Sequence, residues 1–212
     1  MKDIIIVCAG NCALEMYYVI KQINMAAQNA GKEPAWNVLG FLSDVPVDLK
    51  AVGIEVPVLG TIQDWHPIGN EYYGMGNGTP QAKEKLANLL RPRGCRFASI
   101  IAPYTFISDD FVCGEGCLIQ AYRIGCCVKL GDFVSINGSM LMSGAQIDDY
   151  TTTTGYTVVQ SANVGKRVYI GSHAVVTDGV TVGDDAMISV GSIVTEDVRP
   201  KATVFGVPAK EI

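Results

Sequence analysis

A six-residue repeat in the second half of the chain constrains its folding more than any other feature. One place after each repeated aliphatic residue the side chain is most often Gly, Ser or Thr, and four places after it is small or aliphatic. An ordinary strand alternates with a period of two and an α-helix with a period of 3.6, so neither explains this spacing. The repeated aliphatic residues are Val164, Ile170, Val176, Val182, Ile188 and Val194.

A chain that turns a corner after every short strand does explain a period of six. Each repeat then directs one aliphatic side chain into a central core, and small residues allow the bend. Stacked coils bury together a core that no single repeat could bury alone. The rhythm extends upstream to Ile107, with spacings of five before Ile147 and before Val164. We therefore predict an all-β, left-handed parallel β-helix from about Ile107 to Val194, rather than an irregular β-sandwich.

The residues before position 98 instead alternate between strand-like and helix-like segments. The β-branched run Ile4–Val7 predicts a buried parallel strand, and a helix is expected from about Ala13 to Asn29. This alternation predicts a small α/β, Rossmann-like domain over residues 1–97, followed by the β-helix domain with its C-terminal tail over 98–212. Further strands are expected at Asn37–Phe41, Val56–Leu59 and Glu71–Gly74, and a second helix from Thr79-Pro80.

Charge and cysteine spacing exclude several classes of partner. The net charge is −5 and no block of Lys and Arg occurs, which argues against nucleic acid as a partner. The apolar run at the N-terminus ends at Gly10, too early for a signal peptide, and no segment reaches the length of a membrane span. The seven cysteines lack the spacing of a zinc site. We expect a cytoplasmic protein with no membrane span and no metal, whose thiols pack as small apolar groups.

Short motifs along essentially the whole chain share the pattern of one known family. They are Cys8–Ala13, Gly40–Asp44, Val56–Thr61, Gly114–Ile119, Leu130–Asn137 and Val204–Lys210. On these residues the chain resembles the hexapeptide-repeat sugar acyltransferases of the sialic acid O-acetyltransferase and UDP-N-acetylbacillosamine N-acetyltransferase type.

This resemblance implies a homotrimer with acetyl-CoA in the groove between adjacent β-helices and a sugar or nucleotide sugar held by the N-terminal domain. It also implies that a histidine with an acidic neighbour takes the proton from the attacking amine or hydroxyl, without a metal. The implied substrate-binding residues are Ala9, Gly10, Asn11, Cys12, Ser43, Asp44, Gly76 and Asn77. The implied acetyl-CoA-binding residues are Thr152, Ser172, His173 and Val190.

The proton-accepting pair of that family has no counterpart in this sequence. Ser143 and Gly144 stand at its positions, and Thr152 stands where the family has a second histidine. The chain contains only His66 and His173, and neither aligns with these positions. A serine without a histidine does not accept a proton well at neutral pH. The catalytic positions are therefore expected to be atypical.

The glycine-rich turn near the N-terminus departs from the family as well. Cys8, Cys12 and Ala13 replace a glycine, a histidine and a glycine, whereas Gly10 is retained. Those glycines normally permit a tight turn and a close approach of phosphate to the backbone. Asn11 can adopt left-handed dihedral angles. The turn is expected to persist with altered substrate contacts.

Other polar residues of the predicted β-helix can be interpreted either as functional or as structural. Asp148 and its neighbour Asp149 could act as a base if buried, or could be solvated corner carboxylates. The run Thr151–Thr154 suits strands with hydroxyls directed outward. Tyr150 and Tyr156 are expected to pack on the β-helix.

Three functional hypotheses follow. The first is an acetyl-CoA-dependent acetyltransferase acting on an amino or hydroxyl group of a sugar or nucleotide sugar, with an atypical site. The second is a catalytically silent homologue that binds nucleotide sugar or CoA, or serves as a trimeric scaffold. The third is a different acyl donor or a relocated site. We favour the enzyme because a thioester is an activated donor and positioning alone accelerates acyl transfer.

Overall fold

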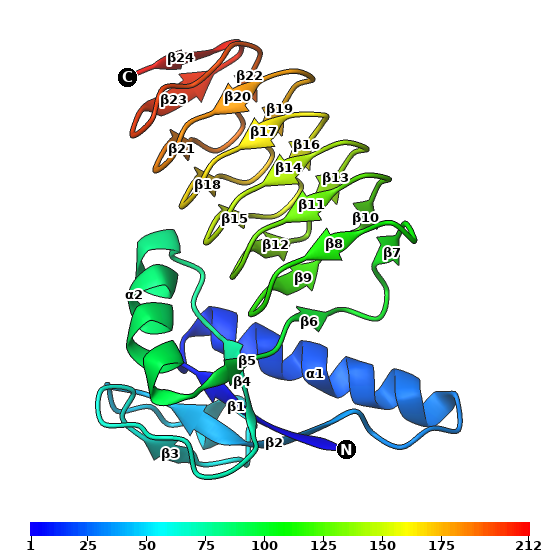
Figure 1. Cartoon of the computed structure of the whole chain (residues 1–212), viewed down its shortest axis with the longest axis vertical. Coiled ribbons are helices and arrows are strands. Elements are labelled where there is room, and N and C mark those ends of the chain that lie inside the picture. Colours follow the sequence, from blue (N-terminus) through cyan, green and yellow to red (C-terminus); the bar gives the residue numbers. More distant parts are fainter. The chain divides into compact units, whose positions relative to one another are not determined.

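The computed structural model describes residues 1–212, which form two compact units. The first unit comprises Met1–Gly78 and Ala82–Pro103, and the second comprises Thr79–Gln81 and Tyr104–Ile212. Figure 1 shows an α/β unit coloured blue to green and a stack of short strands coloured green to red.

The first unit is built on a five-stranded parallel sheet in the order β3-β2-β1-β4-β5. Its central strand β1 (Lys2–Val7) carries the predicted β-branched run, and Ile4 to Val7 are completely buried. The chain moves from β1 to β2 and β3 on one side, then returns to β4 and β5 on the other. The other strands are β2 (Trp36–Leu42), β3 (Val58–Gly60), β4 (Tyr72–Met75), β5 (Arg96–Phe97) and, outside this sheet, β6 (Ile100–Ile101).

Helix α1 (Asn11–Asn29) begins two residues earlier than the hydrophobic pattern predicts, directly after Gly10. Its buried residues recur every three or four positions, so they lie on one face of the helix, and this face packs in the core. These residues are Ala13, Met16, Val19 and Ile20. Helix α2 (Pro80–Leu90) starts at the predicted proline. Short 3₁₀ helices occur at Lys50–Val52 and Arg91–Arg93.

The second unit consists of three sheets of very short strands, and each coil of the chain adds one parallel strand to a sheet; the C-terminal pair β23–β24 is antiparallel. This arrangement fits the predicted left-handed parallel β-helix. The β7 sheet contains β7 (Phe106–Ile107), β10 (Arg123–Ile124), β13 (Met140–Leu141), β16 (Val158–Val159), β19 (Val175–Val176) and β22 (Ile193–Val194). The β8 sheet contains β8 (Val112–Cys113), β11 (Lys129–Leu130), β14 (Gln146–Ile147), β17 (Asn163–Val164) and β20 (Thr181–Val182). The second unit's strands of the β9 sheet are β9 (Leu118–Gln120), β12 (Ser135–Asn137), β15 (Thr152–Thr153), β18 (Tyr169–Ile170), β21 (Met187–Ile188), β23 (Thr203–Gly206) and β24 (Ala209–Glu211).

The hexad rule identifies most inward positions, but one predicted spacing is wrong. Leu141 is the buried inward residue, so the five-residue step lies between Ile136 and Leu141 rather than before Ile147. Gly138, with a φ of +54°, makes this shortened corner possible. A second short step, before Val164, is where the sequence predicts it, and a third lies between the buried residues Ile119 and Ile124.

The threonine run also differs from the prediction. Thr153 is fully buried at an inward hexad position, so its hydroxyl does not face outward. Its Oγ1 lies 2.8 Å from Oγ of the buried Ser139, whose hydroxyl also lies 3.0 Å from the Thr154 carbonyl oxygen. Because each hydroxyl has a partner, the pair can occupy an otherwise aliphatic core.

Candidate functional sites

A pocket of about 440 Å³ opens at the carboxyl ends of strands β1 and β2 and beside the segment after β4. In parallel α/β sheets ligands bind at this edge, at the point where the strand order reverses. Helix α2 closes the pocket with Ala82, Lys85 and Leu86. The lining includes five of the eight predicted substrate-binding residues: Ala9, Gly10, Ser43, Asp44 and Asn77.

The turn between β1 and α1 forms one wall of this pocket. Cys8 has a φ of +74°, an unusual conformation for a residue other than glycine, and it accepts a long hydrogen bond from Asn77 Nδ2 (3.6 Å). The left-handed position in the turn is therefore Cys8 and not Asn11. Gly10 caps α1 without a side-chain hydrogen bond. The first N–H groups of the helix have no intrahelical acceptor, an arrangement that favours an anion.

Asp44 and Ser43 shape the opposite wall. Asp44 Oδ1 accepts hydrogen bonds from the backbone N–H groups of Ile62 (2.7 Å) and Gln63 (3.1 Å). Its second oxygen has no partner within the chain and can accept hydrogen bonds from a ligand. The Ser43 hydroxyl donates to the Val45 carbonyl oxygen (2.7 Å), which is a structural contact.

The other three predicted substrate residues lie outside the pocket lining. Asn11 is exposed on the first turn of α1, and Cys12 is half-buried beside it. Gly76 is a packing position: a Cβ there would lie 2.6 Å from Ala13 Cβ and 2.6 Å from the Val7 carbonyl oxygen. Lys85 was not predicted from the sequence. It is exposed, lines the pocket and has no ion pair in the structure.

The seven thiols differ in their burial, whereas the sequence predicted that they pack as small apolar groups. Cys126 and Cys127 are exposed at one corner of the β-helix, so that expectation is wrong for them. The pKa of the Cys12 thiol, by contrast, is raised to about 11 by burial, although Lys83 nearby opposes the shift.

We expect iodoacetamide at pH 8 to label Cys126 far faster than Cys12. A pKa of about 11 leaves roughly one Cys12 thiol in a thousand as the reactive thiolate at that pH. Peptide mass spectrometry over time measures both rates, and labelling in denaturant is the control, because unfolding removes the difference. Equal rates in the native protein would contradict the buried placement of Cys12.

In the β-helix, the predicted catalytic positions Ser143 and Gly144 lie at the corner between β13 and β14. Ser143 is exposed, and Gly144 has a φ of +85°. A Cβ on Gly144 would lie 2.6 Å from Ser161 Oγ, so a side chain there would be strained. This corner offers a hydroxyl and no carboxylate.

Asp148 lies at the next corner, after β14, and is exposed. Partial desolvation and the neighbouring Asp149 carboxylate raise the pKa of Asp148. It also borders a pocket of about 470 Å³ on the outer side of the β8 sheet, together with Asn163 and Asp184. It remains a candidate base, with no hydrogen bond to its carboxylate in the structure.

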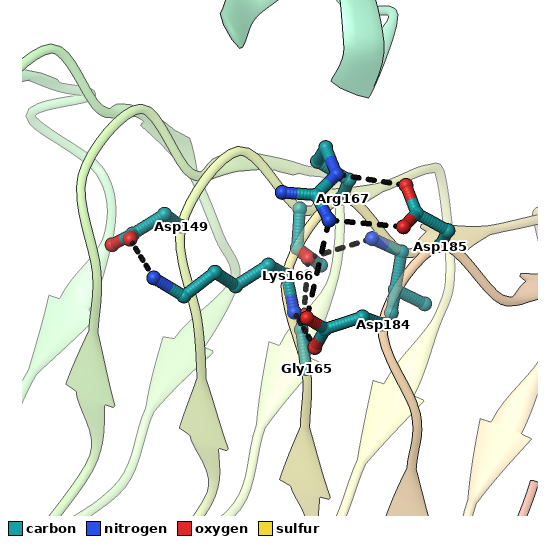
Figure 2. A network of polar contacts seen from close by, with 8 residues as sticks. Asp149, Gly165, Lys166, Arg167, Asp184 and Asp185 are labelled. Atoms are coloured by element: carbon teal, nitrogen blue, oxygen red, sulfur yellow. Dashed lines mark hydrogen bonds and ion pairs between the residues drawn. The ribbon is translucent and has the colours of Figure 1, made fainter. Parts of the chain in front are cut away.

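The carboxylates beside Asp148 are engaged in a network along the same edge (Figure 2). Asp149 accepts from the Asp132 backbone N–H (2.9 Å) and pairs with Lys166 Nζ (2.8 Å). Arg167 forms two parallel bonds with Asp185, at 2.8 and 2.9 Å, which hold the pKa of that carboxyl below its usual range. These groups tie successive coils together and are not free for proton transfer.

Three of the four predicted acetyl-CoA residues share another edge of the β-helix. Ser172 and His173 lie between β18 and β19, and Val190 lies one coil further, where Gly191 N–H donates to the Ser172 carbonyl oxygen (2.9 Å). Thr152 lies apart, on β15, and is 2% exposed. The Ser143 corner joins the β7 and β8 sheets, whereas the Ser172 corner joins the β9 and β7 sheets. Within one chain these two groups therefore lie on different edges.

No family model matches the sequence. The galactoside O-acetyltransferase of Escherichia coli is 37% identical over 87 residues, which cover 40% of this chain and 43% of that enzyme. The chloramphenicol acetyltransferase of Agrobacterium fabrum is 47% identical over 58 residues, or 27% of this chain and 28% of that enzyme. The chain thus spans less than half the length of either relative.

Solved structures match along the whole chain. PerB of Caulobacter crescentus, in complex with CoA and GDP-perosamine, has a TM-score of 0.81 at 22% identity and covers 100% of this chain and 98% of its own. The acetyltransferase domain of PglB from Neisseria gonorrhoeae, in complex with acetyl coenzyme A, has a TM-score of 0.79 at 19% identity, with coverages of 100% and 99%. The chain has the fold of these proteins.

Neither helix combines the length and the apolar character of a membrane-spanning segment. No group of three or more His, Cys, Asp or Glu side chains is arranged to hold a metal ion.

Proposed function

We propose that this protein transfers an acetyl group from acetyl-CoA to an amino or hydroxyl group of a sugar or nucleotide sugar, in the cytoplasm. The observation that carries the proposal is the match of both units, over the full chain, to PerB with its bound CoA and GDP-perosamine. The local likeness of the repeat region to curated acetyltransferases supports the same reaction.

The first unit would act as a Rossmann-like domain that binds the nucleotide sugar. Its pocket presents the N-terminus of α1 and the Lys85 ammonium, both suited to a diphosphate. The free oxygen of Asp44 is suited to ligand hydroxyl groups. The remaining lining is largely apolar, with Val45, Val47 and Leu86.

The second unit would bind acetyl-CoA along the edge that carries Ser172 and Val190. Acyl transfer requires a proton acceptor near the attacking atom and donors for the developing oxyanion. Ser143 and Gly144 do not supply the acceptor, so the reaction would proceed without the family's histidine. This absence is what favours the second candidate function, a silent homologue that binds nucleotide sugar or CoA.

We infer a homotrimer assembled through the outer side of the β7 sheet. Its outward residues are mostly apolar, whereas those of the β8 sheet are mostly polar. On the β7 sheet they are Phe106, Arg123, Met140, Val158, Val175 and Ile193, and on the β8 sheet Val112, Lys129, Gln146, Asn163 and Thr181. A site that uses both the Ser143 and Ser172 edges requires a second copy of the chain, because one chain separates them.

The test is release of free thiol from acetyl-CoA in the presence of a panel of UDP-, GDP- and dTDP-amino sugars. Mass spectrometry of the acceptor then identifies the acetylated product. Turnover with one class of acceptor supports the transferase. Binding of CoA or nucleotide sugar without any turnover on the panel supports the silent homologue instead.

We expect Lys85→Glu to weaken nucleotide-sugar binding roughly tenfold at low salt, because it places a carboxylate where the diphosphate would lie. Isothermal titration calorimetry at low and high salt measures the effect, which should shrink as salt screens the charge. Lys32→Glu is the matched control, since Lys32 is also exposed but lies outside the pocket. Equal weakening in both variants would show a general charge effect and not a phosphate site.

A further inference from the structure

An exposed stack of aromatic rings runs along the edge between the β9 and β7 sheets. The rings of Tyr156 and His173 lie 5.0 Å apart at an angle of 17°, and those of Tyr122 and Tyr156 lie 6.1 Å apart at 29°. Tyr122 is 50% exposed and Tyr156 is 62% exposed. The prediction that Tyr156 packs on the β-helix is therefore only half right, because its ring stacks on its neighbours yet remains open to solvent.

The backbone at His173 is held by the preceding coil, and its ring stacks on Tyr156. His173 has a φ of +60°, and its backbone N–H donates to the Gly155 carbonyl oxygen (3.0 Å). The Tyr156 ring stacks in turn on the Tyr122 ring, and the nearby Tyr156 hydroxyl raises the pKa of Tyr122. Tyr122 and Tyr156 stand two coils apart, and Gly138 of the coil between them has no side chain to separate their rings.

The imidazole ring of His173 has no hydrogen-bond partner. His173 is exposed, and neither ring nitrogen makes a hydrogen bond or an ion pair in the structure. The Tyr156 phenol is the titratable group stacked against it, and no carboxylate or cation contacts the ring. A neutral imidazole with a free nitrogen is the side chain best suited to accept a proton near neutral pH.

The alternatives in the β-helix are weaker acceptors. Ser143 has no adjacent base, Asp149 and Asp185 are ion-paired, and Tyr150 is buried in a stack on Phe133. Asp148 remains, but a carboxylate is a weak base compared with imidazole. His173 is the only imidazole of this unit, and it adjoins Ser172 on the edge assigned to acetyl-CoA.

We propose that His173 is the proton acceptor for acyl transfer, with Tyr156 as the positioning residue that orients its ring; this inference rests on the proposed function. The acceptor nitrogen or oxygen attacks the thioester carbonyl carbon, so that one N–C or O–C bond forms and the C–S bond breaks. The proton leaves the attacking atom for a ring nitrogen of His173. The imidazolium then returns it to the departing thiolate, which yields free CoA.

Four variants test this assignment against a purely structural role of the stack. His173→Asn removes the base, Tyr156→Phe keeps the ring, Tyr156→Leu removes it, and Asp148→Asn removes the competing base. His66→Asn is the matched control, because His66 is the other exposed histidine and lies in the first unit. Thermal melting establishes that each variant is folded.

We expect His173→Asn to lower kcat/KM about 100-fold, within the usual range for loss of a general base, with little change in the KM for acetyl-CoA. The pH dependence of its rate should also change, because the base is lost. Tyr156→Phe should stay within about twofold of wild type, and Tyr156→Leu should lose roughly tenfold in kcat, because a misplaced base costs rate.

The results that overturn the inference are distinct from failure of the proposed function. An active wild-type protein whose His173→Asn variant keeps its rate and pH profile overturns the role of His173 alone. The same conclusion follows if Asp148→Asn, and not His173→Asn, lowers the rate and changes its pH dependence. Wild-type protein that binds CoA but never turns over refutes the proposed function, and the role of His173 with it.

Discussion

Val175→Glu is expected to dissociate the proposed homotrimer and to abolish the proposed acetyl transfer. Val175 faces outward on β19, between Val158 and Ile193 on the neighbouring strands of the β7 sheet. A carboxylate in such an apolar contact is desolvated without a partner, at a cost of several kcal/mol for each copy. Light scattering after size exclusion should show the particle mass fall to one third. Activity should fall at least about 100-fold, because the site proposed between copies is lost.

The matched control is Thr181→Glu. Thr181 also faces outward from a two-residue strand, but it lies on the polar β8 sheet and is exposed. We expect this variant to keep both the particle mass and the activity of the wild type. A Val175→Glu protein that remains trimeric would show that the β7 sheet is not the interface, and a dissociated but active one would show that a single chain contains a complete site.

Gly76→Ala is expected to destabilise the first unit and to weaken ligand binding in its pocket. The added Cβ would meet Ala13 Cβ and the Val7 carbonyl oxygen at 2.6 Å each, and both belong to the rigid junction of β1 and α1. Overpacking of this kind costs about 1–3 kcal/mol. The melting temperature of the unit should fall by several degrees, since about 1 kcal/mol shifts a domain of this size by roughly 4–8 °C. Nucleotide-sugar binding should weaken in parallel.

Gly78→Ala provides the control two residues further along the chain. A Cβ at Gly78 would find only Cys12 atoms at 3.9 Å, an ordinary contact. We expect its unfolding free energy to stay within about 0.5 kcal/mol of wild type, as for a typical tolerated substitution. Denaturant unfolding of both variants measures the difference. Equal stability of the two proteins would contradict the close approach of Gly76 to α1.

Much of the fold could be predicted because it depends on local pattern. The period of six specifies a coil that turns after every short strand, and the run Ile4–Val7 specifies a strand buried on both faces. The helix from Pro80 follows from the freedom of proline at the first helical position. The residues after β1 and β2 could be assigned to one pocket because parallel strands end at the same edge of a sheet.

Contacts between distant segments could not be predicted in this way. Lys85 reaches the pocket only because α2 packs beside the ends of β1 and β2. Thr153 is interior only because Ser139, one coil earlier, satisfies its hydroxyl. His173 acquires a fixed orientation from Tyr156, seventeen positions earlier in the chain and directly below it in the stack.

The sequence by itself determined that this chain builds a coil with an inward aliphatic column, and that His173 is the single histidine of that coil. The tertiary structure alone decided which side chains meet at the corners of that coil. Periodicity reports the direction in which each residue points, because it follows from backbone geometry. The partners that a residue contacts depend on how many residues each corner contains. A single shortened step, as at Gly138, therefore changes the contacts of all the residues that follow it in the coil.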